Sequence, residues 1–345
     1  MKTPAPPFVG ALIGCGFVSR HHIEGWKRIP EANLVALCDL DQTALDRASA
    51  RLPGARLYTS ASALFEGEKT LDFIEICTRP CSHRELVELA ARHGAHVLCQ
   101  KPAAAVRPDL EAMIDASAAA GIRLMVHENW RFRHWYRALR AEIDAGTIGR
   151  PIRLRIAHRD TRALRDDGYN DQPYFRTMPR LILLEMGCHL VDTARYLIGE
   201  VQTVSATIGR FGPNTIGEDV AMLHLHFAGG CLGQLEMTWC APADLCRTEW
   251  ALNETAVEGT LGTLRLLPDG SLERITPTGR RERRAVALPP DDEVYVEGYV
   301  ATQRHFIEGI LNGTEHETRA TDTLRTMDVI WTAYRSAEEG RTLAV

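Results

Sequence analysis

The chain has 345 residues, which predicts two domains at roughly 150 residues per domain. Hydrophobic residues make up 45% and charged residues 25%, the composition of an ordinary globular protein with a sizeable core. The formal net charge of −5 argues against nucleic acid or an anionic membrane as a partner. No apolar run approaches the roughly 18 residues of a membrane span.

Nine cysteines are scattered along the chain without CxxC pairs. Several lie in apolar, strand-like runs, namely Cys38, Cys77 and Cys99, which is typical of reduced and buried thiols. Residues 1–7 lack the apolar region of a secretory leader. These features predict a cytoplasmic protein.

A zinc site would require clustered ligands. The candidates are two cysteines and two histidines of the second half of the chain: Cys240, Cys246, His224 and His226. Their spacing is also that of ordinary strand side chains, which is the interpretation we favour. We therefore expect no metal site.

The first third of the chain alternates strands and helices. The expected strands are residues 8–13, 33–38, 71–77, 95–99 and 122–126. The expected helices are residues 18–29, 42–52, 82–93 and 108–120. Unbroken apolar strands between helices indicate a parallel sheet buried on both faces, and right-handed crossovers then make it doubly wound. We assign this α/β domain to residues 1–127.

The pattern changes in residues 128–345, which we assign to a second domain. The expected helices are residues 130–146, 181–197, 296–311 and 321–338. The expected strands are residues 151–158, two within 220–239 around the turn at Gly229-Gly230, and further short strands within 248–275. Strands that follow one another without intervening helices predict an antiparallel or mixed sheet, and hence an α+β domain.

Residues 159–179 show little periodicity but contain several arginines and aromatic residues. Irregular segments of this length within compact domains are usually functional. We interpret this one as a substrate-covering loop, with an oligomer contact as the alternative. Its arginines are Arg159, Arg162, Arg165 and Arg176. Because arginine forks suit carboxylates and phosphates, they favour an acidic or highly hydroxylated substrate.

A glycine loop follows the first expected strand and precedes a helix, as a dinucleotide site requires. Gly14 permits a tight turn, and Gly16 permits close approach of a pyrophosphate to the backbone. The third position is Ser19, which is small enough for packing. The second strand ends in Asp39, whose carboxylate suits the ribose hydroxyls of NAD and would repel the 2′-phosphate of NADP. The alternative is that Asp39 caps the next helix.

Lys101 follows the expected strand at residues 95–99, and His189 lies on the expected helix at residues 181–197. A dinucleotide loop followed by a lysine and a histidine on separate elements indicates hydride transfer coupled to proton transfer. An imidazole suits the proton acceptor, and an ammonium suits stabilisation of an alkoxide. Glu185 lies one expected helical turn before His189, on the same face.

Five segments in this order resemble the glucose-fructose oxidoreductase / inositol dehydrogenase / rhizopine-catabolism (Gfo/Idh/MocA) superfamily. They are Gly14-Cys15-Gly16 with Asp39, Thr78-Arg79-Pro80 with His83, Gln100-Lys101-Pro102, Glu128-Asn129-Trp130-Arg131-Phe132, and Gly187-Cys188-His189 with Asp192. A weaker match is Glu258-Gly259-Thr260-Leu261-Gly262.

The resemblance implies a Rossmann domain, a second α+β domain with a large open, mostly antiparallel sheet, and a homodimer or homotetramer formed through that sheet. It implies NAD-dependent chemistry on a hydroxyl of a sugar, polyol or sugar acid. Lys101, His189 and Glu185 would be catalytic. The cofactor residues would be Gly14, Gly16, Phe17, Val18, Asp39, Thr78, His83, Gln100, Lys101 and Asn129. The substrate residues would be Lys101, Trp130, Arg131, His158, Arg159, Arg176, Glu185 and His189. We expect a structural hydrogen-bonding role for Asp192.

The chain departs from the family pattern at two positions. Gln100 stands where the family usually has Glu, and Glu185 stands where it most often has Asp. Two other functions remain open: an NAD-retaining glycosidase or epimerase-like enzyme, and a non-catalytic NAD-binding regulator. The presence of both Lys101 and His189 argues against the regulator.

Overall fold

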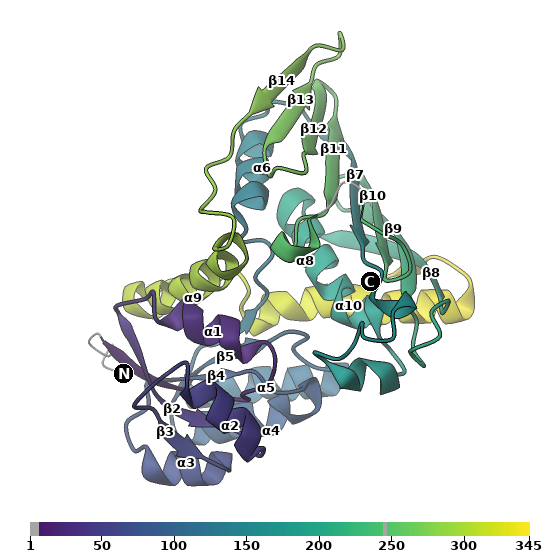
Figure 1. The fold of residues 1–345 in the computed structure, drawn as a ribbon. Helices are drawn as coiled ribbons and strands as arrows, with labels where there is room; N and C mark the ends of the chain where they lie inside the picture. Colours follow the sequence, from purple (N-terminus) through teal and green to yellow (C-terminus); the bar gives the residue numbers. More distant parts are fainter. Residues whose placement is uncertain (1–6, 244–246) are drawn as a thin grey trace. The chain divides into compact units, whose positions relative to one another are not determined.

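The computed structural model describes residues 7–243 and 247–345 (Figure 1). The chain forms two compact units. The first consists of Met1–Asn129 and Val296–Arg325, and the second of Trp130–Tyr295 and Thr326–Val345. Cys246, one of the residues considered for zinc, lies outside the described residues.

The first unit contains a six-stranded sheet in the order β3-β2-β1-β4-β5-β6, with every neighbouring pair parallel. The strands are β1 (Phe8–Ile13), β2 (Ala32–Cys38), β3 (Arg56–Tyr58), β4 (Phe73–Ile76), β5 (His96–Gln100) and β6 (Leu124–His127). This order is that of a dinucleotide-binding doubly wound sheet, and the expected fold class is confirmed. Strand β3 was not expected, because its three residues are half-buried or exposed and carry no apolar run.

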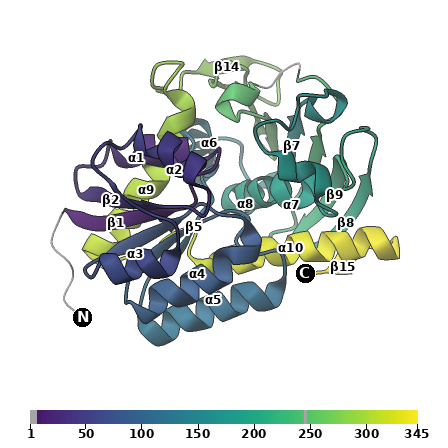
Figure 2. The ribbon, with the colours of Figure 1, turned by 60° about the horizontal axis from the view of Figure 1, so that its bottom comes forward.

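Helices connect these strands: α1 (Ser19–Trp26), α2 (Gln42–Ser49), α3 (Ala61–Gly67), α4 (Pro80–Arg92) and α5 (Arg107–Ala120). The side chain of Asp41 caps α2 by accepting from the Thr43 amide at 2.9 Å. Ser60 caps α3, a helix that the sequence pattern did not predict, by accepting from the Ala63 amide at 3.2 Å. Figures 1 and 2 show α1 and α4 on opposite faces of the sheet.

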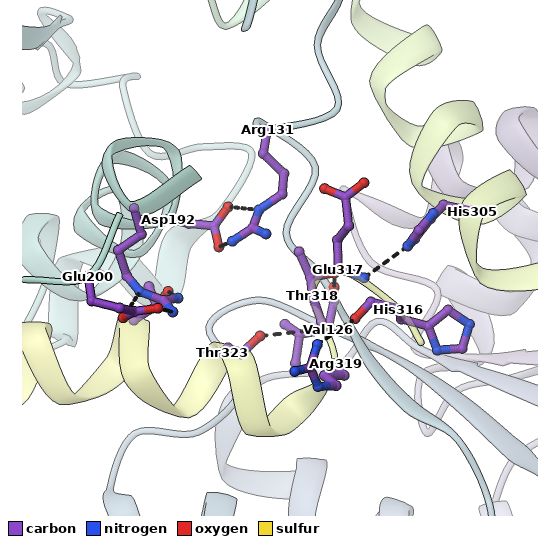
Figure 3. Close-up of polar contacts among 12 residues, drawn as sticks. Val126, Arg131, Asp192, Glu200, His305, His316, Glu317, Thr318, Arg319 and Thr323 are labelled. Atoms are coloured by element: carbon purple, nitrogen blue, oxygen red, sulfur yellow. Dashed lines mark hydrogen bonds and ion pairs between the residues drawn. The ribbon is translucent and has the colours of Figure 1, made fainter. Parts of the chain in front are cut away.

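Residues 296–325 return to the first unit, which differs from the expected boundary after residue 127. They include most of α9 (Val294–Asn312). The Phe306 ring lies edge-on to Phe73 of β4, with centroids 6.1 Å apart. Thr318 extends the edge of β6, since it donates from its hydroxyl to the Val126 carbonyl at 2.7 Å and accepts from the Val126 amide at 2.8 Å (Figure 3). Apolar packing on β4 and hydrogen bonds to the backbone of β6 thus hold this distant stretch of sequence in the first unit.

The second unit contains a nine-stranded sheet in the order β14-β13-β12-β11-β7-β10-β9-β8-β15. The strands are β7 (Pro151–Arg159), β8 (Val201–Gly209), β9 (Val220–Phe227), β10 (Leu232–Thr238), β11 (Glu254–Gly259), β12 (Gly262–Leu266), β13 (Leu272–Ile275), β14 (Arg281–Arg284) and β15 (Leu343–Ala344). β7 and β10 run parallel and the other neighbours antiparallel, which confirms the mostly antiparallel sheet.

Helices α7 (Ile182–Glu185) and α8 (Gly187–Ile198) pack against the central strands β7, β9 and β10. The continuous helix expected over residues 181–197 is therefore wrong, because the chain breaks regular geometry at Met186. The remaining helices are α6 (His134–Asp144) and α10 (Ala320–Glu339). No helix among the described residues is long and apolar enough to cross a membrane.

The segment expected as a covering loop contains two short 3₁₀ turns, Arg162–Leu164 and Pro173–Thr177. The ring of Tyr169 is fully buried beside Trp239, at 5.8 Å between centroids, and beside Phe175, at 6.2 Å. Aromatic contacts within the segment and with Trp239, which follows β10, thus hold the segment compact.

Candidate active site

The glycine loop lies at the carboxyl end of β1 and leads into α1. Gly14 has φ +99°, and a Cβ there would lie 2.7 Å from backbone atoms of Cys77 and Thr78. A side chain is thus excluded both by conformation and by the neighbouring strand end. Gly16 faces open space, since a Cβ there would have no heavy atom of the described residues within 4 Å. Phe17 is 37% exposed and Val18 immediately precedes α1.

Asp39 ends β2 and contacts this loop directly. One carboxylate oxygen accepts from the Cys15 amide at 2.6 Å, and the other accepts from the Asp41 amide at 2.9 Å. Because each carboxylate oxygen has two lone pairs, the group can still accept from hydroxyls. Asp41, not Asp39, caps α2, so the capping alternative for Asp39 is wrong.

Burial, reinforced by the nearby Asp39 charge, raises the pKa of the Cys15 thiol to about 12. The thiol beside the glycine loop is therefore neutral and unreactive at ordinary pH. The other cysteines of the described residues are also free thiols, in line with the expected reduced state.

His83 connects two loops at the carboxyl ends of neighbouring strands. Its Nδ1 lies 3.0 Å from the Ala103 carbonyl and its Nε2 lies 3.1 Å from the Thr78 carbonyl. Burial lowers the pKa of His83 and outweighs these two carbonyl contacts, so the neutral ring donates to one carbonyl at a time. These two contacts brace the loops that follow β4 and β5.

Gln100 is the last residue of β5, and Lys101 follows it. The Gln100 side-chain oxygen accepts from the Lys101 amide at 2.6 Å, and its side-chain nitrogen contacts His22 Nε2 at 2.7 Å. The polar atoms of Gln100 are thus bonded within the protein. Asn129, the last residue of this stretch of the first unit, is buried with 5% exposure.

In the second unit, His189 lies in the first turn of α8 and is 6% exposed. Its imidazole stacks on the Trp130 indole, with centroids 4.5 Å apart and ring planes only 2° from parallel. Stacking of this kind fixes the plane of the imidazole through the ring faces. Glu185 ends α7 before the break at Met186 and is also buried.

His158 of β7 lies near the same indole, with its centroid 6.0 Å from that of Trp130. Its Nδ1 bonds to the Asn253 side-chain oxygen at 2.8 Å. Burial lowers the pKa of His158 and outweighs the opposing effect of Asn253. The fold therefore brings together three aromatic side chains that the sequence pattern identifies only one by one: Trp130, His158 and His189.

The Arg131 side chain forms an ion pair with a residue of α8. It makes a two-pronged ion pair with Asp192 of α8, at 2.8 Å and 2.6 Å, and both side chains are buried (Figure 3). The expected hydrogen-bonding role of Asp192 is confirmed. This geometry uses Nε and one terminal nitrogen of the guanidinium, and it fixes the Arg131 side chain against α8.

The loop arginines do not converge on one point. Arg159 pairs with Glu254 at 2.9 Å and with Glu236 at 3.2 Å, so three strands of the sheet share it. Arg159 and buried His158 are consecutive on β7 and therefore project to opposite faces of the sheet. Arg176 bonds to the Asp166 carbonyl and lies over the Tyr169 ring. These partners weaken the inference of an acidic substrate from the arginine content.

The residues of the first unit fit a dinucleotide. At Gly14 and Gly16 the loop has no side chain that would keep a pyrophosphate away from the backbone. The Asp39 carboxylate lies at the end of β2. Three side chains with buried polar partners escaped the sequence interpretation: His22, Glu75 and Asn253. No motif marks them, because each acquires its partner only through the tertiary fold.

Comparison with known proteins agrees with this geometry. The family model described as "Oxidoreductase family, NAD-binding Rossmann fold" matches residues 9–128, and the "GFO/IDH/MocA C-terminal domain" matches residues 136–265. The chain is 37% identical to D-apiose dehydrogenase of Paraburkholderia graminis, over 99% of this chain and 90% of that protein. It is 35% identical to D-apiose dehydrogenase of Rhizobium rhizogenes, over 97% of each.

Among solved structures, an oxidoreductase from Agrobacterium radiobacter in complex with NAD+, L-tartaric acid and magnesium superimposes with a TM-score of 0.90. It shares 32% identity with this chain, and the match covers 98% of both chains. Both halves of the sequence and the whole fold thus agree with one assignment. The chain belongs to the GFO/IDH/MocA oxidoreductase family.

Proposed function

We propose that this protein is an NAD-dependent dehydrogenase that oxidises a hydroxyl group of a sugar, with D-apiose as the first substrate to test. The observation that carries the proposal is the 37% identity to a D-apiose dehydrogenase across 99% of the chain. Similarity on this scale includes both the glycine loop and the segment around His189. The same relatives favour a dehydrogenase over a glycosidase, an epimerase or a non-catalytic regulator.

Gly14, Gly16 and Asp39 would hold the cofactor. The backbone at Gly14 and Gly16 can approach a pyrophosphate at the start of α1, and Asp39 can accept from ribose hydroxyls. The carboxylate would repel a 2′-phosphate, which is why we propose NAD rather than NADP. Bound NAD supplies the hydride acceptor.

His189 and Lys101 would divide the remaining work. A ring nitrogen of His189 accepts the hydroxyl proton, since an imidazole exchanges protons near neutral pH. The Lys101 ammonium donates a hydrogen bond to the same oxygen and stabilises the charge that develops on it. Stacking on Trp130 supports this role of His189, because it holds the imidazole in one plane.

Trp130, His158 and Glu185 would form the sugar side of the site. A neutral His158 can exchange hydrogen bonds with hydroxyls, and burial favours that neutral form by lowering its pKa. The Glu185 carboxylate can accept from a hydroxyl and so orient the substrate. The Agrobacterium relative in complex with L-tartaric acid makes a hydroxy acid the natural competitor to include.

The test is a screen of reduced-NAD absorbance across D-apiose, other aldoses, polyols and L-tartrate, with NAD and NADP in parallel. The proposal expects NAD reduction with a sugar and the highest kcat/KM for D-apiose. Absence of turnover with every sugar would overturn it. Purified protein that retains stoichiometric NAD, and shows no net reduction, would instead favour the glycosidase or epimerase-like function.

We further propose a cytoplasmic homodimer or homotetramer assembled through the large sheet. One face of this sheet carries alternating charges on neighbouring strands, including the Arg153–Glu258 pair at 3.3 Å and the Arg155–Glu254 pair. Such a face suits a polar contact between copies. Sedimentation equilibrium, repeated with Arg155→Glu, tests it; a monomeric wild-type protein would contradict it.

A further inference from the structure

A buried chain of polar side chains in the first unit ends at the Lys101 backbone. His22 of α1 and Glu75 of β4 are fully buried, and Gln100 is 7% exposed. The Lys101 amide donates to the Gln100 side-chain oxygen at 2.6 Å. Gln100 Nε2 lies 2.7 Å from His22 Nε2, and His22 Nδ1 lies 2.7 Å from Glu75 Oε1. The three links connect α1, β4 and β5.

The chemistry of the groups sets the direction of every link. A backbone N–H can only donate, so the oxygen of the Gln100 amide must face Lys101 and its nitrogen must face His22. An amide nitrogen offers only hydrogens, so His22 Nε2 must accept. The single ring proton of a neutral imidazole then lies on Nδ1, from which it donates to Glu75. The network thus requires one tautomer of His22.

Two further donors complete the carboxylate end. Trp26 Nε1 donates to Glu75 Oε2, and the Gln303 amide nitrogen donates to the same oxygen at 3.2 Å and to the His22 carbonyl at 3.1 Å. Gln303 belongs to α9, the helix that returns to this unit. Glycine at position 25 permits that approach, because a Cβ there would collide with the Gln303 side chain. The buried charge of Glu75 is therefore solvated by directed donors.

His22, Glu75 and His127 also lie close enough together to hold a metal ion. However, both ring nitrogens of His22 are engaged by Gln100 and Glu75, and both oxygens of Glu75 accept hydrogen bonds. A metal would have to break this network at two of its three ligands. The geometry is that of a hydrogen-bonded brace.

This inference rests on the proposed role of Lys101. We propose that three positioning residues hold the Lys101 backbone through this chain of hydrogen bonds, in which every donor and acceptor is determined: Gln100, His22 and Glu75. The amide of Gln100 donates to His22 Nε2 and so assigns the acceptor role to that nitrogen. A carboxylate at position 100 would accept from His22 Nε2 and demand a second ring proton. Gln100→Glu would thus replace the amide and the singly protonated imidazole of this chain by an imidazolium between two carboxylates.

The tautomer can be read directly, without substrate or turnover. Nitrogen-15 spectra of histidine side chains in the full protein should show His22 protonated on Nδ1 alone. Gln100→Glu should convert it to the doubly protonated form, and the Lys101 amide proton should resonate far downfield in the wild type. A wild-type His22 protonated on Nε2 would overturn the inference. Because this measurement needs no turnover, it tests the hydrogen-bond chain even if the protein is not a dehydrogenase.

Kinetics test whether the brace positions Lys101. In His22→Asn, an amide nitrogen replaces Nδ1 and preserves the link to Glu75, but Gln100 loses its acceptor. In His22→Gln, the side-chain oxygen can reach the place of Nε2 and preserve the link to Gln100. Displacement of a reacting group by about 1 Å can cost on the order of 100-fold in rate. We expect kcat to fall about 10-fold to 100-fold in His22→Asn, with partial recovery in His22→Gln and NAD affinity unchanged.

His316→Asn is the matched control, since His316 is another buried histidine of the same unit and bonds to the Phe306 carbonyl at 2.9 Å. It should lose comparable thermal stability yet retain kcat. Equal losses of kcat in both asparagine variants, or an unchanged kcat in His22→Asn, would show that the brace serves stability alone and overturn its positioning role.

Discussion

The two units hold their candidate side chains by different means. In the first unit, Asp39, His83 and Gln100 bond to backbone amides or carbonyls, which fixes the position of each polar atom. In the second unit, His189 lies flat on the Trp130 ring. Hydrogen bonds use the polar atoms of a side chain, whereas stacking uses only the faces of its ring. The first arrangement suits fixing a loop, and the second suits orienting a ring whose nitrogens take part in chemistry.

The largest effect should come from removing the stacked imidazole. A general base typically contributes about 10²–10⁴ in rate, so His189→Ala should lower kcat by that order. NAD affinity should change little, because the glycine loop and Asp39 remain. Lys101→Ala should cost a similar factor and raise KM more. Steady-state kinetics and NAD titration on the same preparations measure both, and Glu185→Gln should be milder than either. A near-wild-type kcat in His189→Ala, where chemistry limits the rate, would exclude His189 as the base.

Variants of the buried Arg131–Asp192 pair test whether this ion pair of the second unit serves stability alone. Removing one partner of a buried ion pair leaves an uncompensated charge and typically costs about 3–5 kcal/mol. Arg131→Met should lower the free energy of unfolding by that amount in urea denaturation. Adding Asp192→Leu should restore much of it. If the double variant regains stability but shows a greatly raised KM for the sugar, Arg131 contacts substrate after all.

Acidification should weaken the first unit through its buried histidines. Burial lowers the pKa of His316 to about 4, and nearby His305 and Arg123 act in the same direction. Between that value and the ordinary pKa near 6.5, the unfolded chain binds more protons, so stability rises with pH across this window. We therefore expect the titration of His316 to lower the free energy of unfolding by on the order of 3 kcal/mol as pH falls from 6.5 to 4.

The measurement is the free energy of unfolding as a function of pH for the wild type and for His316→Gln. The glutamine amide can still donate to the Phe306 carbonyl but does not titrate. The difference between the two proteins should shrink as pH falls through the window. Parallel curves would mean that His316 is protonated in the folded state or exposed to water.

The smallest effect should fall on cofactor choice. Asp39→Ser removes the carboxylate that would meet the ribose hydroxyls, and we expect NAD binding to weaken about tenfold, the equivalent of one charge-assisted hydrogen bond. Discrimination against NADP should relax as well. Asp39→Asn, which keeps an acceptor for the Cys15 amide, separates the effect on loop structure from the effect of charge. Titration of both cofactors decides it, and a wild-type protein that prefers NADP would refute the assignment.

Local patterns explain which parts of the fold were predictable. The apolar run of Phe8–Ile13 and the glycines at 14 and 16 specify a buried parallel strand and its loop without outside information. Strand β3 and helix α3 were missed because their few residues carry weak periodicity. The break at Met186 was missed because the apolar pattern from Leu181 to Leu197 outweighed the one local signal, Gly187, which directly follows the break.

The candidate site was predictable only where a motif names its residues. Gly14, Asp39, Lys101 and His189 stand in recognisable patterns, whereas His22 and Glu75 lie 53 residues apart and bond only after folding. The same limit applies to Arg131, whose bond to Asp192, 61 residues away, forms only in the folded chain. Charge content alone cannot show which arginines are already paired.

The return of residues 296–325 means that the dinucleotide-binding half is not a portable module. The chain passes between the units three times, after Asn129, Tyr295 and Arg325. A fragment that stops at residue 127 would lack Phe306 against Phe73, Gln303 beside Glu75 and Thr318 along β6. Recombination or gene fusion that exchanges substrate-binding halves between relatives must therefore carry two separate stretches of sequence together. The two units are thus interleaved along the sequence even though each has its own sheet.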